Sequence, residues 1–443
     1  MPVPPAQDPP LTSFGALVRV DELPRDELRG GKVPWSAATP PLRDLRTQSS
    51  PLWFGGGVFG HGMYNEDSVL TSDAAVRALR LAFNYGINAL DSSPYYFPSE
   101  LVLGRALRIL APEHPRDSYF LVTKCGRYGP QRSQFDYSPE RIRASIQQSL
   151  ERLGTTYLDG ALLHDAEFVS EQPAIALTDE GRWLAASAVG LSDKYSPDEA
   201  RRLLGIAPDD AARIRGPGDE AVLQAARTLF ELKDAGIVRN VGLSGYPLGE
   251  LVRLSRLIAS HAPYRSLDVV LSYSNHTLHA DLLPAWQALF DASPSGAPWT
   301  PPMLLNASPF SMGLLSDRGP PVWHPADAPL RAATHAALQE IQQDAAARTA
   351  SFMPANQALA TTALFRGLRG SELVTQDGVP ALRTLLGMSN TDEVHTAIAT
   401  YRVLAAHDDP ARAQLASYEA RVRQRLVEAG TVDQTWPSPP ADA

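Results

Sequence analysis

The sequence contains very little cysteine: Cys125 is the single thiol in 443 residues. One thiol excludes an intramolecular disulfide framework and a cysteine-cluster metal site. Positive charge is also scarce, because 40 Lys and Arg residues face 49 Asp and Glu residues, for a net charge of −9. We therefore expect no broad basic surface for nucleic acid or anionic lipid.

Long apolar runs are absent as well. No stretch approaches the roughly 20 apolar residues that a membrane-spanning helix needs. The first ten residues, MPVPPAQDPP, contain neither the basic region nor the apolar region of a secretory signal. The sequence thus predicts a cytoplasmic protein with no membrane partner, and it leaves the choice between a monomer and a homodimer open.

Proline, by contrast, is abundant, with 38 residues in the chain, and both ends of the chain are rich in it. Residues 1–45 and 433–443 combine proline with a lack of apolar periodicity, so we expect both to be disordered. The intervening residues, 46–432, are assigned to a single domain.

Eight short and nearly continuous apolar stretches alternate with segments of helical period in this domain. Such stretches are typical of parallel strands that are buried on both faces. They are residues 51–60, Ile87–Asp91, Tyr119–Lys124, Tyr157–His164, Val238–Ser244, Leu267–Tyr273, Met303–Ser308 and Thr384–Met388. Eight strands close a (β/α)₈ barrel, so the predicted fold class is an α/β TIM barrel.

A doubly wound open sheet is the alternative fold. Its dinucleotide-binding fingerprint needs a glycine-rich turn that leads directly into a helix. The glycines at 55–62 are followed by MYNEDSVLTSD, which begins with no helical pattern. The barrel is therefore favoured.

Three segments exceed what a minimal barrel needs. Residues 170–218 and 316–350 each follow a strand and are far longer than ordinary βα loops of about 2–6 residues. Both should lie on the face where barrel enzymes carry their sites. A further helix is expected at about 411–429.

Four polar residues stand where apolar strands end: Asp91, Tyr96 just beyond it, Lys124 and His164. The carboxyl ends of barrel strands face one mouth, so these side chains can converge. A phenol has a pKa of about 10, which a nearby ammonium lowers. The set can therefore move a proton on or off a carbinol oxygen, but it offers no acyl-transfer nucleophile and no metal ligands.

The segment GINALDSSPYYFPSELVLGRAL resembles the signature of the aldo-keto reductase superfamily. The signature has an Asp, a Tyr five residues later, then Ser-Glu and Leu-Gly, as in this sequence. Further segments, GIVRNVGLSGYPL, NASPFSMGLLSDRG and LLGMSNTDEV, are similar to the branch of D-arabinose 1-dehydrogenases and L-galactose dehydrogenases.

This resemblance implies an NAD(P)-dependent oxidation of an aldopyranose to its aldonolactone. Tyr96 would be the general acid/base, Lys124 and Asp91 would tune it, and His164 would orient the substrate. The implied sugar is of the D-arabinose, L-galactose or L-fucose type. Two alternatives remain: an NADPH-dependent aldehyde or ketone reductase, and a non-catalytic nucleotide-binding regulatory barrel.

The resemblance also places the cofactor. Its contacts are assigned to Gly56, Asp91, Ser244, Ser308, Phe310, Gly387, Met388 and Ser389. Where NADP-preferring members carry Lys and Arg, this chain has Met388 and Val394, with acidic Asp392 and Glu393 between them. A 2′-phosphate would meet carboxylates there, so NAD is expected to be preferred over NADP.

Aromatic residues on the strand-end loops could contact a sugar. We select Tyr95 and Trp323, in addition to His164, as candidate substrate contacts. Ordinary packing within the loops is the alternative interpretation for both aromatic residues.

Overall fold

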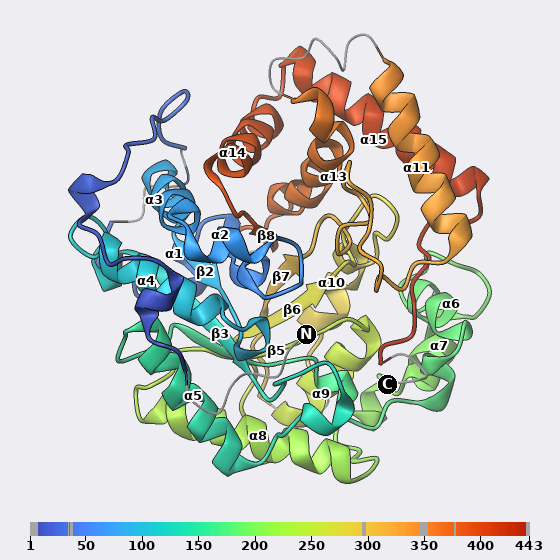
Figure 1. The fold of residues 1–443 in the computed structure, drawn as a ribbon. Helices are drawn as coiled ribbons and strands as arrows, with labels where there is room; N and C mark the ends of the chain where they lie inside the picture. The colour runs from blue at the N-terminus through green and yellow to red at the C-terminus, as the bar shows by residue number, and fades with distance from the viewer. Residues whose placement is uncertain are drawn as a thin grey trace.

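The computed structural model describes residues 8–33, 35, 39–294, 298–344, 353–375 and 378–439. Eight parallel strands form a closed barrel in the order of the chain, which confirms the barrel and excludes the open sheet (Figure 1). They are β1 (Leu52–Gly55), β2 (Ala89–Asp91), β3 (Phe120–Cys125), β4 (Gly160–Leu163), β5 (Val241–Gly245), β6 (Val269–Tyr273), β7 (Met303–Ala307) and β8 (Leu382–Gly387).

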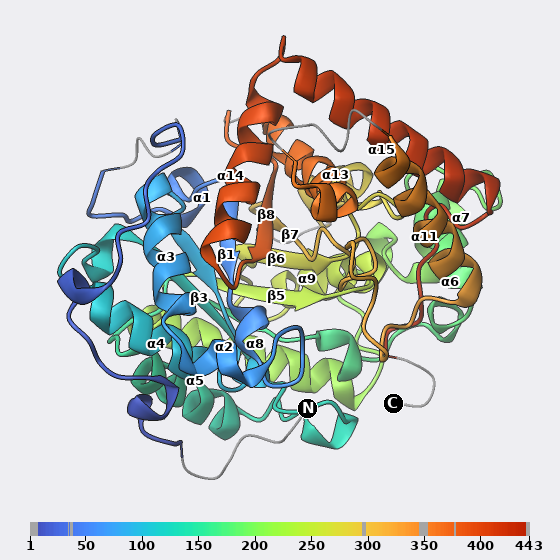
Figure 2. The same cartoon turned by 45° about the horizontal axis from the view of Figure 1, so that its top comes forward.

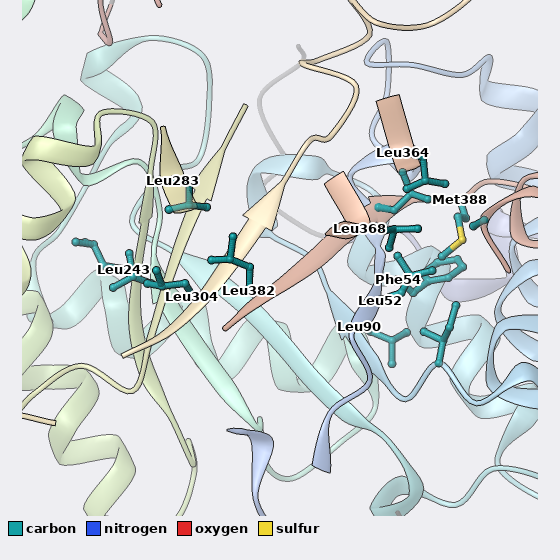
Figure 3. Close-up of a cluster of buried hydrophobic side chains, with 14 of the residues drawn as sticks. Leu52, Phe54, Leu90, Leu243, Leu283, Leu304, Leu364, Leu368, Leu382 and Met388 are labelled. Carbon is teal, nitrogen blue, oxygen red and sulfur yellow. The ribbon is translucent and has the colours of Figure 1, made fainter. Parts of the chain in front are cut away.

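Alternation along each strand produces two apolar layers. Side chains that point inward, such as Trp53, Phe120 and Leu305, fill the inside of the barrel. Those that point outward pack against the helices. Figure 3 shows part of this outer layer, where strand residues such as Phe54 lie near Leu364. Both faces of every strand are thus buried, which explains why the strands have continuous apolar sequences.

A helix follows each strand and covers the outside of the barrel (Figures 1 and 2). In chain order these helices are α3 (Ala74–Tyr85), α4 (Ser99–Leu110), α5 (Pro139–Leu153), α8 (Pro217–Asp234), α9 (Leu248–Ala259), α10 (Leu283–Asp291), α13 (Ala358–Leu368) and α14 (Thr391–Ala405). Ser138 caps α5 by accepting a hydrogen bond from the amide of Arg141, and Pro139 occupies the first helical position.

The two long insertions contain helices of their own. Residues 170–218 form α6 (Glu180–Ser187) and α7 (Pro197–Leu204), and residues 316–344 include α11 (Ala328–Gln343). Residues 345–350 of the second insertion lie outside the described residues. The expected C-terminal helix is α15 (Pro410–Glu428), which lies beside α11 (Figure 2). Arg421 and Arg425 of α15 join the two helices through Glu340, at 3.1 and 2.8 Å.

The expected disorder of the N-terminal segment is wrong for the described part of residues 8–45. Phe14 is buried against the barrel, the Arg105 guanidinium donates to the carbonyl of Ala16 at 2.6 Å, and Arg152 pairs with Asp8 at 2.6 Å. The barrel's long cationic side chains anchor an irregular segment that has no periodic signal. Residues 1–7, 34 and 36–38 lie outside the described residues.

The C-terminal segment is a second correction, because residues 433–439 were expected to be disordered and instead pack on the barrel. The ring of Trp436 stacks on that of Tyr246 at 5.0 Å. Ser438 Oγ donates to Glu167 at 3.0 Å. Further hydrogen bonds hold this C-terminal strap, residues 433–439: Gln172 donates to the carbonyl of Ser438 at 2.7 Å, and Gln434 donates to Asp327 at 2.9 Å. None of these contacts contributes to a repeating pattern. Residues 440–443 lie outside the described residues.

Candidate active site

Four of the selected residues meet at the carboxyl ends of β2, β3 and β4. Asp91 is the last residue of β2, Lys124 lies in β3, and His164 directly follows β4. Tyr96 ends a short 3₁₀ turn, Pro94–Tyr96, beyond β2. The strands are adjacent and in parallel register, which brings residues far apart in the sequence to one mouth.

Asp91 and Lys124 form a buried ion pair between Oδ1 and Nζ. The ammonium also donates to the carbonyl of Ser92 at 3.2 Å and lies 4.9 Å from the centre of the Tyr96 ring. Burial raises the pKa of Asp91, and the charge of Lys124 opposes that effect. The second carboxylate oxygen, Oδ2, is buried without a hydrogen-bond partner among the described residues.

His164 lies beside this pair with one ring nitrogen engaged. Its Nδ1 is 2.9 Å from Ser93 Oγ, and its ring contacts both Tyr95 and Tyr96 edge-on at 5.5 Å. Burial, reinforced by the positive charges of Lys124 and Arg127, lowers the pKa of His164 well below its usual value. The imidazole is therefore neutral at physiological pH.

The electrostatics of Tyr96 differ from the expectation that Lys124 lowers its pKa. Burial, followed by the negative charges of Asp91 and Asp165, raises the pKa of Tyr96 well above its usual value. The ammonium faces the ring, and its charge is already neutralised by Asp91. Tyr96 is thus a neutral phenol in this structure.

Two charged residues of the site were not selected from the sequence. Arg127 follows β3, pairs with Asp165, and donates from Nη2 to the hydroxyl oxygen of Tyr95 at 2.9 Å. Asp165 adopts a left-handed backbone conformation with a φ of 51°. Both residues follow strand ends: Arg127 comes three residues after Lys124, and Asp165 directly follows His164. These positions could have identified them from the sequence.

The two other aromatic residues at the mouth come from distant loops. Trp323, from the insertion after β7, meets Tyr64 edge-on with 6.1 Å between ring centres. Their exposed fractions are 50% and 40%. Tyr95, the other selected aromatic residue, lies beside His164. The structure therefore brings Tyr95 next to the four central residues. Trp323 instead pairs with Tyr64, a residue that the sequence analysis did not select.

Apart from Asp91 of β2, the residues assigned to the cofactor lie at the carboxyl ends of β1, β5, β7 and β8. Gly387 ends β8 and pairs in register with Gly55 of β1. Gly56 lies where a Cβ would come within 2.7 Å of Ser99 Oγ. Ser244 Oγ donates to the carbonyl of Leu163 at 3.1 Å. Ser308 accepts from the amide of Met312 at 2.7 Å, and Phe310 is half-buried.

The turn between β8 and α14 presents carboxylates. Met388 is fully buried and contributes its side chain to the outer apolar layer (Figure 3). The amide and hydroxyl of Ser389 both donate to the Glu393 carboxylate, at 2.6 and 3.0 Å. Met388 can thus reach a ligand only through its backbone, and the Ser389 donors already serve Glu393.

These features fit a nicotinamide dinucleotide. The orphaned Oδ2 of Asp91 can accept a hydrogen bond from a ribose hydroxyl. Asp392 and Glu393 lie in the first turn of helix α14, beside the residues assigned to the cofactor.

The described residues contain no group of three His, Cys, Asp or Glu side chains that could hold a metal ion. They also contain no helix that is both long and apolar enough to cross a membrane.

Comparisons with known proteins show the family of the chain. The model of the aldo/keto reductase family matches residues 51–318. The chain belongs to the aldo/keto reductase family. It is 31% identical over 360 residues to D-arabinose 1-dehydrogenase of Saccharomyces cerevisiae, covering 81% of this chain and 84% of that one.

One further relative supports the family assignment, and one solved structure supports the fold. L-galactose dehydrogenase of Arabidopsis thaliana is 32% identical over 296 residues, which cover 66% of this chain and 68% of that one. The solved glycerol dehydrogenase of Gluconobacter oxydans has the same fold, with a TM-score of 0.51 at 18% identity. That likeness covers 89% of this chain and 95% of the other.

Proposed function

We propose that this protein is an NAD-dependent aldose 1-dehydrogenase that oxidises an aldopyranose of the D-arabinose, L-galactose or L-fucose type to its aldonolactone. The observation that carries the proposal is the meeting of Tyr96, neutral His164 and the Asp91–Lys124 pair at one mouth. The sugar dehydrogenases among the relatives support the substrate class.

The side chains divide the work on the anomeric hydroxyl. His164 uses Nδ1 to bind Ser93, while Nε2 lies 3.7 Å from the Asp165 carboxylate, beyond hydrogen-bond distance, and can hold the reacting oxygen. Tyr96, once deprotonated, takes the hydroxyl proton as general base. Lys124, held by Asp91, faces the Tyr96 ring at 4.9 Å from its centre and keeps the ring in place. The bound nicotinamide supplies the acceptor for the anomeric hydride.

A panel of aldoses tests this proposal by following NADH formation. D-arabinose, L-galactose and L-fucose are compared with the methyl glycoside of the best substrate, which lacks the anomeric hydroxyl proton. We expect turnover of at least one free sugar and none of its glycoside. Failure of every aldose, with reduction of an aldehyde or ketone by NADPH, would favour the reductase. Nucleotide binding without turnover of either kind would favour the regulatory barrel.

The preference for NAD rests on the turn before α14. A 2′-phosphate placed there would lie near Asp392 and Glu393, whose charges repel it. Titration of the free protein with NAD and NADP, followed by intrinsic fluorescence, measures both dissociation constants without turnover. Tighter binding of NAD is expected; tighter binding of NADP would overturn the preference.

A further inference from the structure

Arg127 holds Tyr95 in one orientation. Its guanidinium carbon lies 3.8 Å from the centre of the Tyr95 ring, and Nη2 donates to the Tyr95 hydroxyl oxygen at 2.9 Å. The other side of the guanidinium is fixed, because Nη1 pairs with the buried Asp165. Stacking, a hydrogen bond and an ion pair thus act on one planar group.

This clamp determines what the Tyr95 hydroxyl can do. A phenol oxygen can accept a hydrogen bond while its own O–H donates another. Arg127 supplies the donor to that oxygen, and no hydrogen bond from the Tyr95 proton to a described residue is found. The proton of Tyr95 is therefore available to a ligand.

The location of that donor is equally specific. The ring centre of Tyr95 lies 5.7 Å from that of Tyr96 and 5.5 Å from that of His164. Tyr96 and His164 are themselves 5.5 Å apart, so the three rings form a nearly equilateral triangle. Tyr96 and His164 would hold the anomeric oxygen, and Tyr95 stands at the third corner.

We propose that Arg127 positions Tyr95 so that its hydroxyl donates a hydrogen bond to the 2-hydroxyl oxygen of the aldopyranose. This assignment rests on the proposed function and adds a specificity-determining residue to it. Arg127 itself is a positioning residue, because its guanidinium donors already serve Tyr95, Asp165 and the carbonyl of Gly129.

Besides the anomeric oxygen, the two sugar oxygens nearest the reacting carbon are the ring oxygen, which is bonded to it, and the 2-hydroxyl oxygen on the next carbon, and the chemistry selects between them. As hydride leaves that carbon, positive charge develops there and is shared with the ring oxygen. A donor on the ring oxygen would withdraw the stabilising lone pair and oppose the reaction. A donor on the 2-hydroxyl oxygen binds the sugar without drawing on that lone pair.

The experiment compares kcat/KM for the best aldose and for its 2-deoxy analogue. It uses the wild type, Tyr95→Phe, Arg127→Lys and the double variant. Phe keeps the ring that Arg127 and His164 contact, and Lys keeps a cation for Asp165. Tyr119→Phe is the matched control, since Tyr119 immediately precedes β3 at the opposite end of the barrel.

We expect Tyr95→Phe to lower kcat/KM for the parent sugar about tenfold, the effect of one hydrogen bond, and to leave the 2-deoxy sugar nearly unchanged. Arg127→Lys should also lower the ratio of kcat/KM for the parent sugar to kcat/KM for the 2-deoxy sugar. In the double variant this ratio should be no lower than in Tyr95→Phe. Tyr119→Phe should behave as the wild type. The dissociation constants of the aldonolactone and its 2-deoxy form from the NADH complex should show the same pattern.

An equal loss for both sugars in Tyr95→Phe would overturn the assignment of Tyr95. Additive effects of the two substitutions would overturn the positioning role of Arg127. Either result leaves aldose oxidation by the wild type intact. If the wild type oxidises no aldose, the proposed function fails and the assignment falls with it.

Discussion

The two halves of the barrel mouth differ in how their polar groups are satisfied. At the ends of β2, β3 and β4, charged and polar side chains bind one another: Lys124 with Asp91, Arg127 with Asp165, and Ser93 with His164. At the ends of β1 and β8 the chain places small residues, among them the facing Gly55 and Gly387. We call these the paired half and the small-residue half.

The difference indicates a division of labour. The paired half is organised before any ligand binds, which is the preorganisation that proton transfer at a developing charge requires. The small-residue half lets a ligand approach the backbone closely. Chemistry should therefore depend on the paired half, and cofactor choice on the small-residue half with the turn that follows β8.

The largest effect is expected for Tyr96→Phe, in the paired half. The substitution removes the group that exchanges the proton and keeps the ring, so kcat should fall about 10²–10⁴-fold. The dissociation constant of NAD, measured by fluorescence titration, should remain within about twofold of wild type because the small-residue half is untouched. Full turnover by the variant would rule out Tyr96 as the acid/base.

Lys124→Met tests whether the paired half also stabilises the fold. Removing the cation leaves Asp91 buried and uncompensated, which typically costs about 3–5 kcal/mol. The loss of unfolding free energy in urea should shrink as the pH falls, because the folded protein then favours a protonated Asp91. In Lys124→Met/Asp91→Asn the penalty should be smaller, since no charge is stranded. Equal penalties in both variants would contradict the ion-pair explanation.

The pH dependence of turnover is the next expectation. The pKa of Tyr96 is raised, so the phenolate needed for oxidation becomes more populated as the pH rises. Oxidative kcat/KM should increase up to about tenfold per pH unit on the alkaline side of neutrality. His164, whose pKa is lowered, should add no inflection near its usual value. Oxidation that slows as the pH rises would contradict this assignment of roles.

The smallest effect is expected in the small-residue half. Glu393→Gln removes one negative charge beside the predicted adenosine site and keeps a side chain that can cap Ser389. The ratio of the NADP to the NAD dissociation constant should fall about 2–10-fold, as expected for one partly exposed charge. Turnover with NAD should change little. If the ratio of the two dissociation constants equals that of the wild type, Glu393 does not contribute to the choice between NAD and NADP.

Much of the fold could be predicted from the sequence because strands buried on both faces have continuous apolar runs. All eight strands overlap the predicted stretches, and the strand-end positions of Asp91, Lys124 and His164 followed from them. The N-terminal segment and the C-terminal strap could not be predicted in this way. Irregularly spaced contacts, such as those of Phe14 and Trp436, fix them, and contacts without a regular spacing leave no periodic signal.

The pKa shifts in the site also could not be predicted from the sequence alone. The pKa of Tyr96 depends on burial and on Asp165, whose position follows from a left-handed turn after His164. Whether Lys124 faces the ring or the hydroxyl of Tyr96 is likewise a property of three-dimensional packing. The residue types at the strand ends were enough to predict proton transfer at a hydroxyl group. The protonation states of Tyr96 and His164 follow from the folded structure.

The central claim is most directly tested with an aldose that carries deuterium at the anomeric carbon. The purified protein is incubated with NAD and the labelled sugar, and the cofactor produced is analysed by mass spectrometry. An aldose 1-dehydrogenase must transfer that hydrogen, so the NADH should contain one deuterium and the sugar should become its lactone. Unlabelled NADH, or no NADH from any aldose, would contradict the account.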